Sequence, residues 1–167
     1  MSLASANVSR RTYQAGVSLA DVRRSVRIRA AALAAGAPTQ AGHMLRHLDS
    51  SNYYMAELQL NTNQSIDLRL RRNVAGTLTT LATVPTSLTH GTSSWYGITA
   101  EVVGDQFRAR AWDTSAGSEG TTWMAQVTDT SLPGAGNPDC GPPRRPARRS
   151  PPSSSSTSTP PRRTGPT

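Results

Sequence analysis

The sequence predicts an all-β fold, a two-sheet antiparallel sandwich, and three observations lead to this prediction. Apolar and polar residues alternate along short segments between positions 42 and 112, as in strands that bury one face. Gly, Asn, Asp and Pro residues lie between these segments, where turns are needed. Nine short segments of this kind, spread over about 120 residues from position 12 onwards, require two sheets.

The predicted strands follow from this alternation. In the segment 52–60, Tyr54, Ala56, Leu58 and Leu60 share one face, and the next segment repeats the pattern. One face of each strand is therefore expected to be core. In order, the predicted strands are 12–17, 22–32, 42–48, 52–60, 66–73, 77–84, 95–103, 107–112 and 123–128.

Four turns are predicted to close hairpins, at 49–52, 61–64, 74–76 and 104–106. Each contains Asn, Asp or Gly, which tolerate left-handed backbone conformations or cap a tight reversal. Segment 30–35 has helical propensity, but the alternation of the preceding strand leads into it and Gly36 and Pro38 end it. It is interpreted as a strand end and loop.

Composition limits the possible classes of protein. The 167 residues suffice for one domain with a single core, and no stretch approaches the about 20 apolar residues of a membrane span. The N-terminus resembles no export or transit signal, and the lone Cys140 cannot form an internal disulfide. All 18 basic residues other than histidine are Arg, which indicates a GC-rich bacterial or phage genome.

Four motifs carry a resemblance: residues 46–56 with the pattern Arg-x-x-Asp-x-x-Asn-Tyr-Tyr, the strand 76–81, Trp95-Tyr96, and residues 107–112. Their order resembles the concanavalin A-like, laminin G-like jelly-roll superfamily, in particular its uncharacterised actinobacterial and phage-associated members. The resemblance covers about residues 1–136 and implies a jelly-roll fold and an extracellular or virion-associated location. Its motifs specify no ligand.

The resemblance also implies an incomplete domain. Members begin with a further Gly- and Trp-containing segment and end with two more strands, so residues 1–137 are expected to lack an edge strand and the closing strands. Residues 138–167 are rich in Pro, Arg, Ser and Thr, which predicts a disordered tail.

The tail has three possible origins. Read one base earlier, the codons of residues 139–141 can encode Gly-Leu-Arg, as in the missing strand, so a single-base frameshift is the favoured hypothesis. The alternatives are a genuine Pro/Ser/Thr stalk and, least favoured, a basic arm that binds nucleic acid. The nucleotide sequence across codons 130–167 distinguishes a frameshift from the other two.

No catalytic arrangement is predicted. Glycosidases need two carboxyl groups about 5 to 10 Å apart, but Glu57, Asp67 and Glu101 are each followed two positions later by a non-acidic residue. The spacing of the three histidines matches no zinc site, and no nucleophile elbow or phosphate-binding loop occurs. We therefore expect no enzyme and no cofactor.

Calcium is considered only at Asp49 and Asn52, whose oxygens alternatively close an Asx-type turn.

The candidate binding residues lie on the polar faces of their strands. Aromatic rings stack on sugars, and guanidinium groups donate to hydroxyls or carboxylates. Alternatively, the arginines pair with Asp67 or Glu57 across the strands. Of the three tryptophans, Trp112 is the one expected to be partly exposed, because it lies at a strand end beside Asp113. The candidate ligand-binding residues are Tyr53, Arg69, Arg71, Arg108, Arg110 and Trp112.

These residues lead to a functional hypothesis of a non-catalytic recognition module that binds carbohydrate on a cell surface or a phage-like particle. The alternative is a structural or assembly component whose exposed sheet edges pair with other protein chains. Nucleic acid is the least favoured partner, and no membrane insertion is expected.

Overall fold

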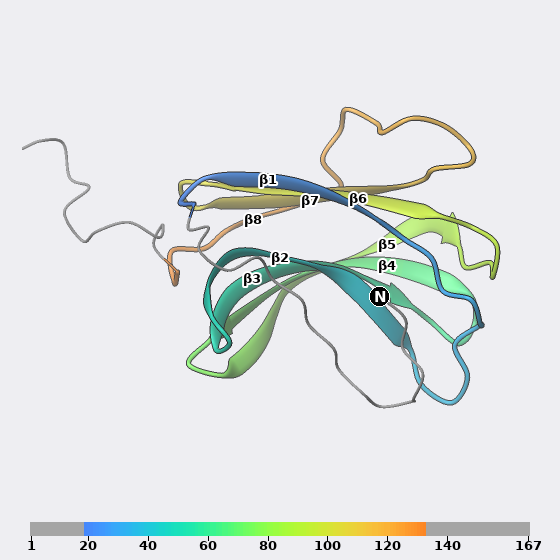
Figure 1. Ribbon diagram of the computed structural model, residues 1–167, viewed down its shortest axis with the longest axis horizontal. Helices are drawn as coiled ribbons and strands as arrows, with labels where there is room; N and C mark the ends of the chain where they lie inside the picture. Colours follow the sequence, from blue (N-terminus) through green and yellow to red (C-terminus); the bar gives the residue numbers. More distant parts are fainter. Residues whose placement is uncertain (1–18, 133–167) are drawn as a thin grey trace, which may run out of the picture. The chain divides into compact units, whose positions relative to one another are not determined.

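The computed structural model describes residues 19–132, which form two antiparallel four-stranded sheets packed face to face (Figure 1). Sheet A has the order β1-β6-β7-β8, with β1 Val22–Ile28, β6 Tyr96–Val103, β7 Gln106–Asp113 and β8 Ala125–Thr128. Sheet B has the order β2-β3-β4-β5, with β2 Thr39–Asp49, β3 Asn52–Leu60, β4 Ser65–Val74 and β5 Thr77–Thr89. The predicted all-β two-sheet sandwich is confirmed.

Eight of the nine predicted strands are present, with different bounds at some ends. The first ends at Ile28 rather than at residue 32, and β5 continues to Thr89 rather than stopping at residue 84. Pro85 is accommodated within β5 because an edge strand does not need every backbone N–H for pairing. The predicted strand 12–17 and the tail 138–167 lie outside the described residues.

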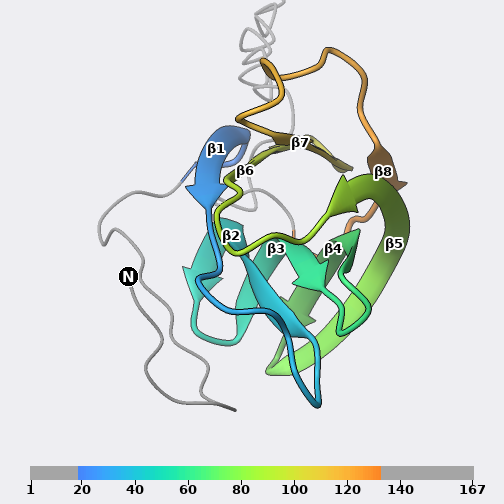
Figure 2. The same ribbon diagram turned by 90° about the vertical axis from the view of Figure 1, so that its right-hand side faces the viewer.

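All four predicted hairpins are confirmed, joining β2 to β3, β3 to β4, β4 to β5 and β6 to β7. In the β4–β5 turn, Ala75 and Gly76 both have positive φ, of 50° and 82°, as in the tight turns that suit the twist of a hairpin. The chain changes sheet twice, between β1 and β2 and between β5 and β6 (Figure 2). No helix that could cross a membrane occurs within residues 19–132.

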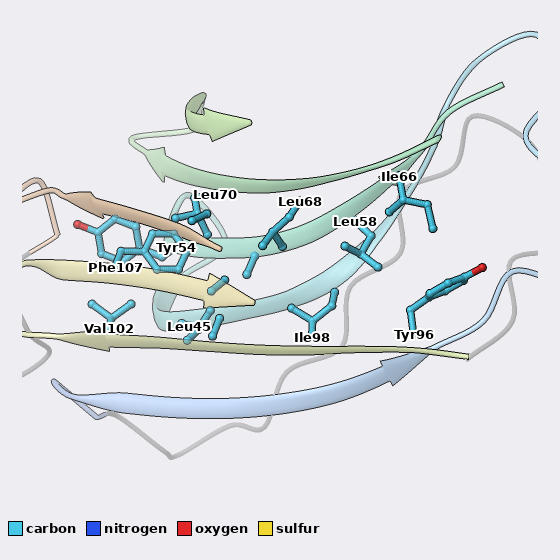
Figure 3. Close-up of a cluster of buried hydrophobic side chains, with 14 of the residues drawn as sticks. Leu45, Tyr54, Leu58, Ile66, Leu68, Leu70, Tyr96, Ile98, Val102 and Phe107 are labelled. Carbon is cyan, nitrogen blue, oxygen red and sulfur yellow. The ribbon is translucent and has the colours of Figure 1, made fainter. Parts of the chain in front are cut away.

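The core lies between the two sheets and contains the residues that the alternation assigned to it (Figure 3). Tyr54 of β3 and Phe107 of β7 meet across the interface with ring centroids 5.1 Å apart. Full burial of each large apolar side chain contributes about 1.5–3 kcal/mol. The buried cluster includes Leu45, Leu58, Leu60, Ile66, Leu68, Leu70, Tyr96, Ile98 and Val102.

Arg46 ties one end of the sandwich together. It lies at an irregularity of the β2–β3 pairing, and its φ of 44° is in the left-handed region. Its guanidinium group donates to three backbone carbonyls, those of Ala20 at 2.8 Å, Leu132 at 2.8 Å and Gly104 at 2.7 Å. This single buried side chain therefore connects β2 with both ends of the described chain and with the β6–β7 turn.

Candidate functional site

The structure separates the six candidate binding residues into two sets on opposite surfaces of the sandwich. In β3 and β4 the inward positions are occupied by core residues such as Tyr54 and Leu70, so the alternate positions face outward from sheet B. The same reasoning places the β7 candidates on the outer face of sheet A, because Phe107 and Ala109 are core. Tyr53, Arg69 and Arg71 belong to the first set, and Arg108, Arg110 and Trp112 to the second.

The arginines on the outer face of sheet B are held by neighbouring side chains. Arg71 Nη1 donates to Glu57 Oε1 at 3.2 Å, and Arg69 Nε lies 3.6 Å from the same oxygen. Arg69 also donates to Gln59 and to Thr80. The two arginine side chains are only 13% and 15% exposed, and Glu57 is buried. This is the cross-strand pairing with Glu57 that was the alternative expectation for these residues.

Tyr53 lies on the outer side of sheet B, as its strand position predicts, but it lacks the exposure that a binding residue needs. The residue is completely buried, and its ring is stacked on His47 with a centroid distance of 6.0 Å. Its cross-strand partner Asn73 is also buried. Alternation predicts which face of the sheet a side chain occupies, but it does not determine how open that face is, so Tyr53 offers no platform for a ligand.

The outer face of sheet A presents arginine and tryptophan side chains in register across its strands. Arg23, Ser25 and Arg27 of β1 point to the side away from the core, since Val22 and Val26 pack inward. Cross-strand pairing then defines three rows on this face. The rows are Arg23, Glu101 and Arg108; Ser25, Thr99 and Arg110; and Arg27, Gly97 and Trp112.

The segment 114–124 passes over this face and brings Trp123 onto it (Figure 1). The guanidinium carbons of Arg110, Arg108 and Arg23 lie 4.4, 4.7 and 5.6 Å from the Trp123 ring centroid, which is the range of cation–π contacts. We call these four residues the Trp123 cluster. It contains two of the predicted candidates, Arg108 and Arg110.

Two carboxylates neutralise part of this charge. Glu101 accepts from Arg108 Nε at 2.7 Å, and Glu119 accepts from Arg23 Nη2 at 3.2 Å and from Arg110. Burial tends to raise the pKa of Glu119, but hydrogen bonds from Arg110 and Thr99 outweigh it, so this pKa lies below its ordinary value. Glu119 is therefore charged at neutral pH, and the two glutamates hold the arginines in place.

A second group of the same kind lies at Trp95, just before β6. The guanidinium carbons of Arg29 and Arg27 are 5.2 and 5.3 Å from the centroid of the Trp95 ring, and the residue is 40% exposed. Arg27 Nη2 also donates to Thr114 Oγ1 at 3.0 Å. We call Arg27, Arg29 and Trp95 the Trp95 cluster.

Trp112 is partly exposed, as expected, but Trp95 is more exposed. Gly97, the cross-strand neighbour of Trp112, explains why the Trp112 ring is partly covered. A Cβ at position 97 would lie 2.3 Å from atoms of the Trp112 indole, so the ring lies directly against the β6 backbone. A glycine in a strand commonly marks such a close approach.

Sequence reasoning missed most of the residues that complete this face. Arg23 and Arg27 occupy outward positions of a predicted strand, so the alternation could have identified them. Glu119 and Trp123 come from the loop 114–124, and no local pattern indicates that a loop lies on a particular sheet. Arg29 and Trp95 lie at the ends of strands, where the prediction of bounds is least certain.

The proposed calcium ligands have another role in the structure. Asn52 Nδ2 donates to Oδ1 and Oδ2 of Asp49 at 3.0 and 2.9 Å, and the Ser51 amide donates to Oδ1 at 2.7 Å. These hydrogen bonds lower the pKa of Asp49. Asn52 Oδ1 accepts from the Ala75 amide. The pair therefore closes the hairpin as an Asx-type turn and does not fit a calcium site. Within residues 19–132, no group of three or more His, Cys, Asp or Glu residues is placed to hold a metal ion.

Comparisons of the chain with protein-family models, with curated proteins and with solved structures found no match.

Proposed function

We propose that this chain is a non-catalytic recognition module that binds acidic carbohydrate on the outer face of sheet A. The observation that carries the proposal is the Trp123 cluster, in which three guanidinium groups surround one indole. Sugar rings stack on aromatic faces, and guanidinium groups donate two parallel hydrogen bonds to a carboxylate or sulfate. An acidic sugar offers both of these features in a single ring.

The charge of this face favours an anionic ligand. It carries five arginines, at positions 23, 27, 29, 108 and 110, and two glutamates, at positions 101 and 119. The excess of positive charge attracts polyanions, so we expect this face to bind acidic glycans more tightly than neutral ones. The opposite face, on sheet B, is a weaker candidate because its arginines are paired with Glu57 and largely buried.

The resemblance to concanavalin A-like and laminin G-like jelly rolls supports the same proposal, with the module located on a cell surface or a phage-like particle.

A role without catalysis is supported by the positions of the carboxylates Glu57, Asp67 and Glu101. None of them has a second carboxylate two positions further along its strand, so an acid and a nucleophile are not aligned.

Isothermal titration with acidic polysaccharides, with neutral dextran as the comparison, tests the proposal. We expect Arg23→Gln to weaken binding of the acidic polymer about tenfold, because it removes one charged donor from the Trp123 cluster. Arg24→Gln is the matched control: it makes the same change one residue further along β1, at a position that belongs to the other face. Equal losses for the two variants, or equal binding of dextran, would contradict the proposal.

The alternative function is that of an assembly component, and the observation that favours it is β5. This strand has 13 residues and lies at the edge of sheet B, where its outer backbone groups can pair with another chain. Analytical ultracentrifugation distinguishes the two functions. A defined oligomer with no affinity for acidic glycans favours assembly, whereas a monomer that binds them favours recognition.

A further inference from the structure

We infer that the Trp95 cluster is a second anion site, and that it makes the outer face of sheet A a two-point site for a linear chain of acidic sugars. The inference rests on the proposed function, because it names the form of the ligand. It starts from a difference between the two clusters: within residues 19–132, no carboxylate forms an ion pair with the arginines of the Trp95 cluster.

The two clusters differ in their ion pairs. All three arginines around Trp123 pair with Glu101 or Glu119. Arg27 and Arg29, in contrast, make no ion pair within residues 19–132, and the nearby carboxylate of Asp113 accepts hydrogen bonds from Ser115. A ligand anion that binds at Trp95 therefore displaces no carboxylate of the protein.

The Trp95 cluster is also accessible. Trp95 is one of the few large apolar side chains that remain exposed in the described chain, and Arg27 and Arg29 are exposed as well. The backbone of Trp95 is held in place, because its carbonyl accepts from both the amide and the hydroxyl of Thr114. An exposed aromatic ring on a fixed backbone, beside two guanidinium groups that form no ion pair with the described residues, is suited to bind a charged sugar.

The two clusters are aligned along β1. Arg23 belongs to the Trp123 cluster and Arg27 to the Trp95 cluster, and both project from the same face of this strand. Four residues of an antiparallel strand span about 13 Å, which sets the separation of the two charged positions. Trp112 lies in the same row as Arg27, so aromatic surface continues across the sheet at this end.

This spacing favours a glycan over a nucleic acid. A nucleic acid strand carries one negative charge per about 3.4 Å, so its phosphates would meet Glu101 and Glu119 beside the arginines of the Trp123 cluster. An acidic polysaccharide carries fewer charges along its length, and its uncharged hydroxyls can pass the glutamates. Binding at two linked points raises the affinity for a chain that is long enough to reach both clusters.

The test is titration calorimetry with a size-fractionated series of oligogalacturonides, from the monomer to chains that span well beyond about 13 Å. For the natural protein we expect affinity to rise at least about tenfold once the chain reaches both clusters. Trp95→Ala and the double variant Arg27→Gln, Arg29→Gln should remove this rise and leave the affinity of the Trp123 cluster for the shortest binding oligomer unchanged within about twofold. Arg24→Gln is again the control and should keep the rise.

Each alternative result has a distinct meaning. If the Trp95 cluster variants keep the full dependence on chain length, the second site is refuted and the proposed function stands. If they weaken short and long oligomers equally, Trp95 belongs to a single site and the two-point inference is wrong. Tighter binding of a single-stranded DNA of equal charge would overturn the assignment to glycans. Absence of binding by the natural protein would refute the proposed function itself.

Discussion

Replacement of Arg46 by alanine is the most informative perturbation of this fold. The guanidinium group bonds three carbonyls from three separate parts of the chain, and the side chain is only 2% exposed. After truncation, water can reach the carbonyls of Ala20 and Gly104, which lie in partly buried surroundings. The Leu132 carbonyl is in a buried environment and loses its donor without replacement.

The expected loss of stability follows from this difference in burial between the three carbonyls. Loss of the charged donor to the buried Leu132 carbonyl lowers the free energy of unfolding by about 2–3 kcal/mol, and loss of the donor to each of the two partly buried carbonyls lowers it by about 0.5–1 kcal/mol. Arg46→Ala should therefore lower the free energy of unfolding by about 3–5 kcal/mol. Arg46→Gly should lose about 1 kcal/mol less, because glycine adopts the positive φ of this position without strain.

Equilibrium unfolding in urea, followed by tryptophan fluorescence, measures this change. With an m-value of about 2 kcal/mol/M, the expected loss lowers the midpoint by about 2 M. Arg24→Ala, at an exposed position, should change the free energy of unfolding by less than about 0.5 kcal/mol. A loss below about 1 kcal/mol for Arg46→Ala at unchanged m-value would refute the reasoning, since it would mean that the three carbonyls do not depend on this side chain.

Three further predictions concern other parts of the sandwich. Burial, with a smaller contribution from Arg24, lowers the pKa of His43 to about 4 from 6.5. Because the neutral form is favoured in the folded state, stability should be complete above pH 6.5 and fall by up to about 3 kcal/mol towards pH 4, and thermal melts of His43→Leu should show a flatter pH profile. Gly97→Ala should displace the Trp112 indole, which denaturation should report as a loss of about 1–3 kcal/mol and fluorescence as a shifted emission. Glu57→Gln should destabilise by about 2–4 kcal/mol in urea, since it leaves two largely buried guanidinium groups without their carboxylate, and a change within 0.5 kcal/mol would show that the pairing contributes little.

Parts of the candidate site could be predicted because they depend on local pattern. The positions of Arg108 and Arg110 followed from alternation with core residues in one strand, and the structure places both on the outer face of sheet A. The role of Asp49 and Asn52 in a turn followed from their spacing at a hairpin. In each case the relevant partners lie within a few residues along the chain or in the next strand.

Other parts of the site depend on contacts between distant segments. Trp123 meets Arg23 across 100 positions of sequence, and Glu119 reaches the same arginine. Tyr53 alternates like an exposed residue, yet it is buried. Neither alternation nor composition contains information on which loop passes over which face, so these features could not be predicted.

The sequence by itself determined the class of fold, four hairpins and the division of each strand into core and outer positions. These features arise because the two-residue period of a strand and the backbone preferences of turn residues act over short distances. Only the tertiary structure decided that the six candidates lie on opposite surfaces, that Arg46 holds three separate segments, and that tryptophans and arginines gather on sheet A. The physical reason is that burial and ion pairing depend on which distant segments pack together, and that is settled when the two sheets close around their core.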